Sequence, residues 1–154
     1  MRPEGIHLTL KFLGETAAEK SESVRAALSG VHSPSPIRIR IAGWGFFPSE
    51  RRPRVLWAGV EAGPELAELA SAIEGVLEPL GIPAEEKPFR PHLTLARLDP
   101  KYGPQLRSCL TGKTETDFGQ ICAAEFHLYR SVLKPSSAEY TRLETYKFTG
   151  ANSN

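Results

Sequence analysis

The sequence has little of what a membrane protein, a disulfide-bonded protein or a strongly basic protein would need. No apolar run approaches the roughly 20 residues of a membrane-spanning helix, and the first residues, MRPEGI, lack the apolar segment of a secretory signal. The two cysteines, Cys109 and Cys122, are too few for a disulfide framework and lack CxxC spacing. A net charge of +1 excludes binding of nucleic acid over the whole surface. We therefore expect a cytoplasmic protein in which any contact with nucleic acid is local.

Composition and length are those of a folded domain. The 154 residues are 40% apolar and 24% charged, which is typical of globular proteins. A chain of this length buries roughly 70% of its unfolded surface, so it needs no metal or disulfide to fold. Its 13 Gly and 13 Pro argue against a coiled coil or a simple helical bundle. We expect one domain over residues 1–154, built from two lobes.

Hydrophobic periodicity predicts strands in pairs between helices. An α+β fold of mainly antiparallel sheet with outer helices follows from this order. Predicted strands cover residues 6–13, 37–47, 54–60, 91–97, 121–133 and 138–148. Predicted helices cover 16–31, with Thr16 as N-cap, then 65–80, with Pro64 at its start and Gly81 at its end, and 101–110.

An internal repeat is the most informative feature. His7-Leu8-Thr9-Leu10 recurs as His92-Leu93-Thr94-Leu95, although the chain has only four histidines. Each copy precedes a predicted helix and two predicted strands. Such repetition predicts two pseudo-symmetric lobes around a central cleft.

The repeat brings together residue types that suit acid–base chemistry on a phosphodiester. In a strand, residues i and i+2 share a face, so His7 lies beside Thr9, and His92 beside Thr94. Two imidazoles can act as general base and general acid near neutral pH. Two hydroxyls can donate hydrogen bonds to the oxygens of an anionic substrate. A lone histidine on a strand is more often structural, but packing gives no reason to repeat His and Thr together.

The sequence resembles the 2H phosphoesterases, whose twin H-x-T-x motifs match the two HLTL segments. HLTLKFLGE at residues 7–15, RPRVLWAGVE at 52–61, FRPHLTLARL at 89–98 and SVLKPSSAEYTRL at 131–143 are similar to the RNA 2′,3′-cyclic phosphodiesterases, also called 2′-5′ RNA ligases. The resemblance implies opening of a 2′,3′-cyclic phosphate to a 2′-phosphate, without a metal or other cofactor. It implies His7 and His92 as the acid–base pair, with Thr9 and Thr94 on the phosphate.

The two copies are too alike for the sequence to fix which histidine is the acid; we assign His7 as acid and His92 as base. Arg97 matches a family arginine near the phosphate, yet strict alternation puts it on the face opposite His92 unless the strand ends or twists at Ala96. Lys11 either assists the anion or is a solvated residue at the edge of the site. No His or Cys pair has the spacing of zinc ligands, so we expect no metal site.

Further residues have weaker claims to the site. Arg51, Arg52 and Arg54, near Phe47 and Trp57, suit single-stranded RNA or form a solvated hairpin tip. Tyr129, Ser131, Tyr140 and Phe89 either line the cleft or belong to the core and its rim. His32 and His127 lack the motif and are taken as bystanders.

The expected partner is an RNA or nucleotide ending in a 2′,3′-cyclic phosphate. Two alternatives remain: a phosphate-binding module for RNA ends without catalysis, and a phosphodiesterase for another cyclic nucleotide or a 2′-5′ linkage. Family members are expected to be monomers and to carry a strand and a helix before the first motif, where this chain has six residues. One interpretation is a start upstream of Met1. For a chain of this length, we expect either lower stability than that of a full-length relative or self-association that covers an exposed edge.

Overall fold

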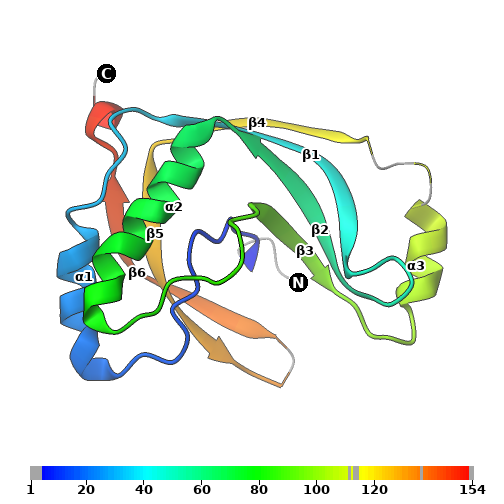
Figure 1. The fold of residues 1–154 in the computed structure, drawn as a ribbon. Helices are drawn as coiled ribbons and strands as arrows, with labels where there is room; N and C mark the ends of the chain where they lie inside the picture. The colour runs from blue at the N-terminus through cyan, green and yellow to red at the C-terminus, as the bar shows by residue number, and fades with distance from the viewer. Residues whose placement is uncertain (1–4, 111, 113–114, 136, 153–154) are drawn as a thin grey trace. The chain divides into compact units, whose positions relative to one another are not determined.

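The structure is a computed structural model that describes residues 5–110, 112, 115–135 and 137–152. Residues 1–4, on which the expectations about the chain start fall, lie outside this range, as does Ser136 of the last predicted turn. The described strands are β1 (Ile37–Pro48), β2 (Pro53–Ala62), β3 (His92–Arg97), β4 (Asp117–Ala123), β5 (Glu125–Leu133) and β6 (Ala138–Lys147). The described α-helices are α1 (Ser21–Leu28), α2 (Pro64–Leu77) and α3 (Gly103–Leu110), with short 3-10 helices at Ala18–Lys20, Glu78–Leu80 and Thr149–Asn152 (Figure 1).

The chain divides into two compact units, each assembled from three stretches of sequence. Unit 1 comprises residues 1–9, 39–61 and 91–121; unit 2 comprises residues 10–38, 62–90 and 122–154. Both HLTL motifs begin in unit 1, since His7, Thr9, His92 and Thr94 all belong to it.

Unit 1 holds most of a four-stranded sheet in the order β3-β2-β1-β4 (Figure 1). β1 and β2 are neighbours joined by residues 49–52, a connection short enough only for an antiparallel hairpin, as predicted. The period-two pattern of Ile37 and Ile39 buries both side chains while the arginine between them is exposed. β3 pairs antiparallel with β2 along the other side. Both edges of the hairpin are therefore extended into one sheet.

Unit 2 contains α1, α2 and the antiparallel hairpin of β5 and β6. α1 and α2 pack against each other (Figure 1), and the Tyr146 hydroxyl on β6 donates to the Arg25 carbonyl on α1 at 3.3 Å. The apolar stripe of α2 is buried at the predicted spacing, with Pro64 opening the helix and Gly81 following it in a left-handed conformation, φ 84°. The buried stripe consists of Leu66, Leu69, Ala70, Ile73 and Leu77.

Two predicted boundaries are wrong. Residues 6–13 form no strand: within that segment, Leu8 makes a single antiparallel bridge to Leu93. The predicted strand 121–133 is interrupted at Ala124, so β4 belongs to the four-stranded sheet and β5 pairs with β6. Apolar and polar residues alternate through residues 6–13 and through Ala124, so the pattern predicted continuous strands there. Such a pattern carries no information about which strand will be the partner.

The helix predicted over 16–31 is shorter and lacks its expected cap. Residues 18–20 form a 3-10 turn, α1 begins at Ser21, and the Thr16 hydroxyl bonds to the Gly14 carbonyl instead of capping the helix. Within α1, the side chains of Val24 and Leu28 are buried. The predicted fold class, α+β with mainly antiparallel sheet and separate helices, is confirmed. In the described ranges no helix is long and apolar enough to cross a membrane.

Candidate active site

The second motif lies on β3, where its pairing with β2 defines one face. His92 is opposite Gly59 and Thr94 is opposite Trp57. Side chains of paired residues project to the same side of a sheet, and residues i and i+2 do likewise. His92, Thr94 and Trp57 therefore share one face, which we call the motif face. His92 and Thr94 are both half-buried.

The first motif meets the second through the Leu8–Leu93 bridge. Antiparallel register extended by one residue in each direction sets His7 across from Thr94, and Thr9 across from His92. Directly opposed residues have Cβ atoms about 4.5–5.5 Å apart. With this register, each imidazole faces a hydroxyl of the other motif in addition to the one of its own motif on the same strand face. The sequence predicted the relation within each motif but not the one between the motifs.

The ring of His7 is oriented by its own chain. Nδ1 lies 2.8 Å from the Gly5 carbonyl oxygen, which can only accept, so Nδ1 carries the proton and donates it. In the neutral ring the lone pair is consequently on Nε2. Any proton exchanged with a substrate by His7 passes through Nε2.

A β-bulge decides where Arg97 projects. β2 residues 55, 56 and 57 pair with β3 residues 97, 96 and 94, so Leu95 is the extra residue. Because one residue is skipped, alternation is offset, and Arg97 opposite Val55 returns to the motif face. Strict alternation had placed it on the other face. Arg97 is exposed at the end of the strand that carries His92 and Thr94.

Two aromatic residues that sequence reasoning linked only to a basic cluster lie against the motif. The Phe47 ring is 5.4 Å from the His92 ring at an interplanar angle of 74°, and 5.4 Å from the Trp57 ring at 33°. A Cβ on Gly45 would lie 2.9 Å from Cε2 and Cη2 of Trp57, so the indole rests on bare backbone. The glycines in the strand segment 42–47 were the available signal, because glycine in a strand often marks close approach.

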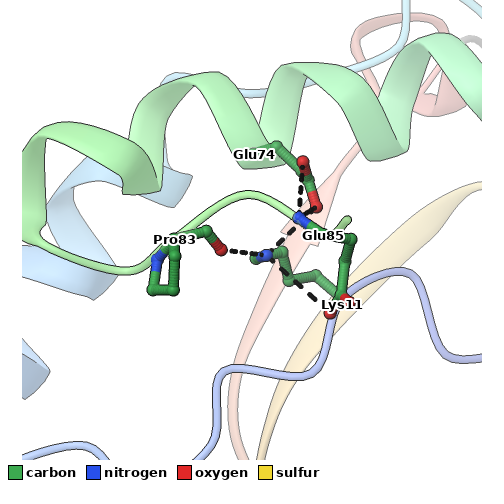
Figure 2. Close-up of polar contacts among 4 residues, drawn as sticks. All are labelled: Lys11, Glu74, Pro83 and Glu85. Carbon is green, nitrogen blue, oxygen red and sulfur yellow. Dashed lines mark hydrogen bonds and ion pairs between the residues drawn. The ribbon is translucent and has the colours of Figure 1, made fainter. Parts of the chain in front are cut away.

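Lys11 does not follow either interpretation considered for it. Its side chain is only 2% exposed, and its ammonium donates to Glu74 Oε1 at 3.0 Å and to the Pro83 carbonyl at 2.8 Å, with Glu85 Oε1 at 3.9 Å (Figure 2). It is therefore neither a solvated residue nor an anion ligand. All four residues belong to unit 2.

The Lys11 cluster also perturbs Glu74. The backbone N–H of Glu85 donates to both carboxylate oxygens of Glu74, at 3.0 and 3.3 Å. This hydrogen bond, followed by the one from Lys11, holds the pKa of Glu74 below its ordinary value of 4.5. Lys11 thus has a structural role, joining the segment after the first motif to α2 and to the segment before the second motif.

The remaining candidate residues lie on several different elements. Arg51, Arg52 and Arg54 are exposed at or beside the β1–β2 turn. Tyr129, Ser131 and Tyr140 lie on β5 and β6 of unit 2, and Phe89 is a half-buried residue of the same unit. His32 is exposed in a loop.

His127 is held in the hairpin of unit 2 as a structural residue. Its Nδ1 is 3.0 Å from Thr145 Oγ1 and its Nε2 is 3.4 Å from Glu125 Oε1. Burial, followed by the nearby charge of Arg142, lowers the pKa of His127 from its ordinary value.

The chemistry available on the motif face is proton transfer and anion binding. Within the described ranges no group of three or more His, Cys, Asp or Glu residues is placed to hold a metal ion. Cys109 and Cys122 are exposed free thiols. Two imidazoles, two hydroxyls and a guanidinium on one face suit a reaction in which a charged phosphate is held while protons move on and off its ester oxygens.

Comparison with known proteins identifies the family. A family model described as the 2′-5′ RNA ligase superfamily matches residues 3–129. A Thermus thermophilus protein named RNA 2′,3′-cyclic phosphodiesterase is 38% identical over 158 residues, covering 96% of this chain and 74% of that protein. A protein of the same name from Archaeoglobus fulgidus is 34% identical over 147 residues, covering 96% and 82%.

Solved structures show the same fold. The crystal structure of TT0787 from Thermus thermophilus matches with a TM-score of 0.78 and 34% identity, over 97% of this chain and 81% of that one. Escherichia coli LigT complexed with 3′-AMP matches with a TM-score of 0.73 and 26% identity, over 95% and 78%. On the match over most of its length, with both HxTx motifs inside the matched region, this chain belongs to the 2′-5′ RNA ligase superfamily.

Proposed function

We propose that the protein is a metal-independent phosphodiesterase that hydrolyses RNA 2′,3′-cyclic phosphate ends to 2′-phosphates. The observation that carries the proposal is the Leu8–Leu93 bridge, whose register opposes two His/Thr pairs on one face. The printed names of the relatives, RNA 2′,3′-cyclic phosphodiesterase, support the same substrate class.

In the proposed reaction, the neutral imidazole of His92 takes a proton from water. The water oxygen forms a bond to phosphorus while the bond from phosphorus to the ribose 3′ oxygen breaks. The His7 imidazolium gives its Nε2 proton to that departing oxygen, which leaves a 3′-hydroxyl and a 2′-phosphate. The hydrogen bond from His7 Nδ1 to the Gly5 carbonyl supports the use of Nε2. Thr9 and Thr94 donate to the non-bridging oxygens, and Arg97 balances the phosphate charge.

The same groups would serve ligation. If a 5′-hydroxyl takes the place of water as the nucleophile, its oxygen bonds to phosphorus and the product is a 2′-5′ linkage. Hydrolysis and ligation then use the same acid–base pair and differ only in the nucleophile, which is water in hydrolysis and the 5′-hydroxyl in ligation. We include reversible 2′-5′ ligation in the proposal as a secondary activity. The proposed partner is RNA, and no membrane takes part in the proposed function.

A nucleoside 2′,3′-cyclic phosphate provides the test. We expect conversion to the 2′-phosphate, identified by phosphorus NMR, in excess EDTA. His7→Ala and His92→Ala should each lower kcat by about 10²–10⁴-fold, because each removes one proton-transfer group. The matched control is His32→Ala, since His32 is exposed in a loop outside both motifs.

The alternatives are separated by the same assay. If the protein binds the cyclic phosphate but the compound is recovered unchanged, the result would favour a phosphate-binding module without catalysis. Formation of a 3′-phosphate would contradict cleavage at the 3′ oxygen. Activity lost in EDTA and restored only by a divalent cation would contradict the metal-independent mechanism.

A further inference from the structure

The His92 imidazole is in contact with one ring from a strand that is not its neighbour. His92 is on β3 and Phe47 is on β1, and β2 lies between them in the sheet. Adjacent strands are about 4.8 Å apart, so a side chain on β1 must reach across roughly 10 Å to meet one on β3. The ring centroids of Phe47 and His92 are nevertheless 5.4 Å apart. This contact requires an open path above β2.

The β2 residue opposite His92 is Gly59, which carries no side chain. A Cβ there would collide with the Ala42 carbonyl oxygen, so the close approach of β1 and β2 also requires glycine. Gly59 therefore adds no side chain beside His92, whose imidazole the Phe47 ring meets edge to face.

Trp57 also contacts Phe47. The two rings are 5.4 Å apart and tilted by 33°, and Trp57 is fixed by resting on Gly45. Its indole Nε1 is buried and has no hydrogen-bond partner among the described residues, so packing rather than hydrogen bonding places this ring. Phe47 therefore contacts both Trp57 and His92, while 39% of its surface stays exposed.

We propose that Phe47, braced by Trp57 over Gly45, is a positioning residue for the His92 imidazole. An edge-to-face contact restricts rotation of the imidazole about its Cβ–Cγ bond, and a proton-transfer group is efficient only when it is held in the reactive orientation. The inference rests on the proposed function, in which His92 transfers a proton. Phe47 acts through His92 and touches no reacting atom.

Kinetics of Phe47 variants on a nucleoside 2′,3′-cyclic phosphate provide the first test. We expect Phe47→Ala to lower kcat by about 10- to 100-fold while KM changes less than about threefold. Phe47→Tyr keeps the ring and should restore kcat, whereas Phe47→Leu keeps apolar volume without a ring and should not. The matched control is Phe118→Ala on β4, because Phe118 is exposed on the opposite edge strand of the same sheet and should leave kcat unchanged. Thermal unfolding of each variant identifies any that fail to fold.

A second readout does not depend on turnover. In protein labelled with ¹⁵N-histidine, the ring resonances of His92, assigned by their loss in His92→Ala, should broaden in Phe47→Ala, because the imidazole then samples more orientations, and stay sharp in Phe47→Tyr. A change of chemical shift alone does not count, because loss of the Phe47 ring current causes one in any case. Gly45→Ala, which displaces Trp57 without touching Phe47, should reproduce the loss of kcat in part.

The proposal is overturned by His92 resonances that stay sharp in Phe47→Ala, by equal effects of Phe47→Ala and Phe118→Ala, or by a loss expressed in KM with kcat retained. The last result would mean that Phe47 contacts substrate. Failure of the proposed function gives a different result. If His92 transfers no proton, His92→Ala keeps full turnover. The His92 resonances would still report whether Phe47 orients the imidazole.

Discussion

The two units differ in what holds them together. Among the described residues, most buried apolar side chains belong to unit 2, where α1, α2, β5 and β6 enclose them. Unit 1 contributes only Ile39, Phe46 and Ala58 to that set, and its chain runs mainly in an open sheet. Burial of apolar area is the dominant stabilising term in folding. Unit 2 is therefore where stability is concentrated, and unit 1 is where the motif residues are displayed.

Their ionic clusters differ in the same way. In unit 2 the Lys11 side chain is 2% exposed and is bonded to Glu74. In unit 1 Arg40 binds Glu61 and Asp117, each at 3.0 Å, but its side chain is 43% exposed. A charge removed from water depends on its partners far more than a charge that water still solvates. Similar pairs of contacts should thus have unequal effects on stability.

The largest expected difference is in the apolar core. Leu77→Ala should lower the free energy of unfolding by about 2–5 kcal/mol, since this fully buried residue of α2 would leave a cavity. Leu56→Ala, on the half-buried β2 strand of unit 1, should cost clearly less. Urea titration monitored by circular dichroism measures both. Equal losses would show that the sheet of unit 1 is as tightly packed as the helices of unit 2.

The next largest difference in unfolding free energy is expected between the two ionic clusters. Lys11→Met should cost roughly 2–4 kcal/mol, because among the described residues it leaves Glu74 with the Glu85 N–H as its remaining partner. Arg40→Met should cost clearly less, because water still solvates the Arg40 guanidinium and both of its partners. In 0.5 M salt the Arg40 effect should shrink, whereas that of buried Lys11 should persist. A Lys11 effect no larger than that of Arg40 would contradict a structural role for the buried ammonium.

The dependence of unfolding free energy on acidic pH should also differ between the Lys11 cluster and the Arg40 cluster. The pKa of Glu74 is lowered in the folded protein, so the unfolded state binds more protons as acid is added. Its stabilising contribution is therefore complete above the ordinary carboxyl pKa and is lost as pH falls through the folded pKa. Glu74→Gln should flatten the dependence of unfolding free energy on pH between about 5 and 3.

Asp117→Asn is the control in unit 1. The pKa of Asp117 is also lowered, chiefly by the Gly119 N–H and then by Arg40, but this carboxylate is more exposed than that of Glu74. Its removal should change the acid slope less. A steeper change for Asp117→Asn than for Glu74→Gln would reverse the comparison.

The smallest effect is expected at two glycines. Gly75 is exposed within α2 and a Cβ there meets nothing within 4 Å, so Gly75→Ala should raise stability by about 0.5–1 kcal/mol. Gly45→Ala in unit 1 should instead lower the melting temperature, because its Cβ would displace the Trp57 ring. Differential scanning calorimetry of the two variants measures these opposite signs. A destabilising Gly75→Ala would indicate a contact that the helix surface does not show.

Much of the fold and the core of the candidate site could be read from the amino-acid sequence. The stripe of α2 and its Pro64 and Gly81 boundaries are local, because a helix satisfies its own backbone and needs only an apolar face. The HLTL repeat likewise identified His7, Thr9, His92 and Thr94 without reference to any partner strand. These features depend on residues a few positions apart, which is the range over which periodicity carries information.

The tertiary structure decided what depends on pairing between distant segments. The bridge between residues 8 and 93 crossed the two His/Thr pairs, and a bulge at Leu95 turned Arg97 to the motif face. The burial of Lys11 against Glu74 and the contact of Phe47 with His92 also join residues more than 40 positions apart. Alternation tells which residues share a face, but it does not tell which strand will lie opposite or where one residue will be skipped. For that reason the sequence by itself determined which residues are repeated and which of them share a face, and only the folded chain decided which segments lie opposite them.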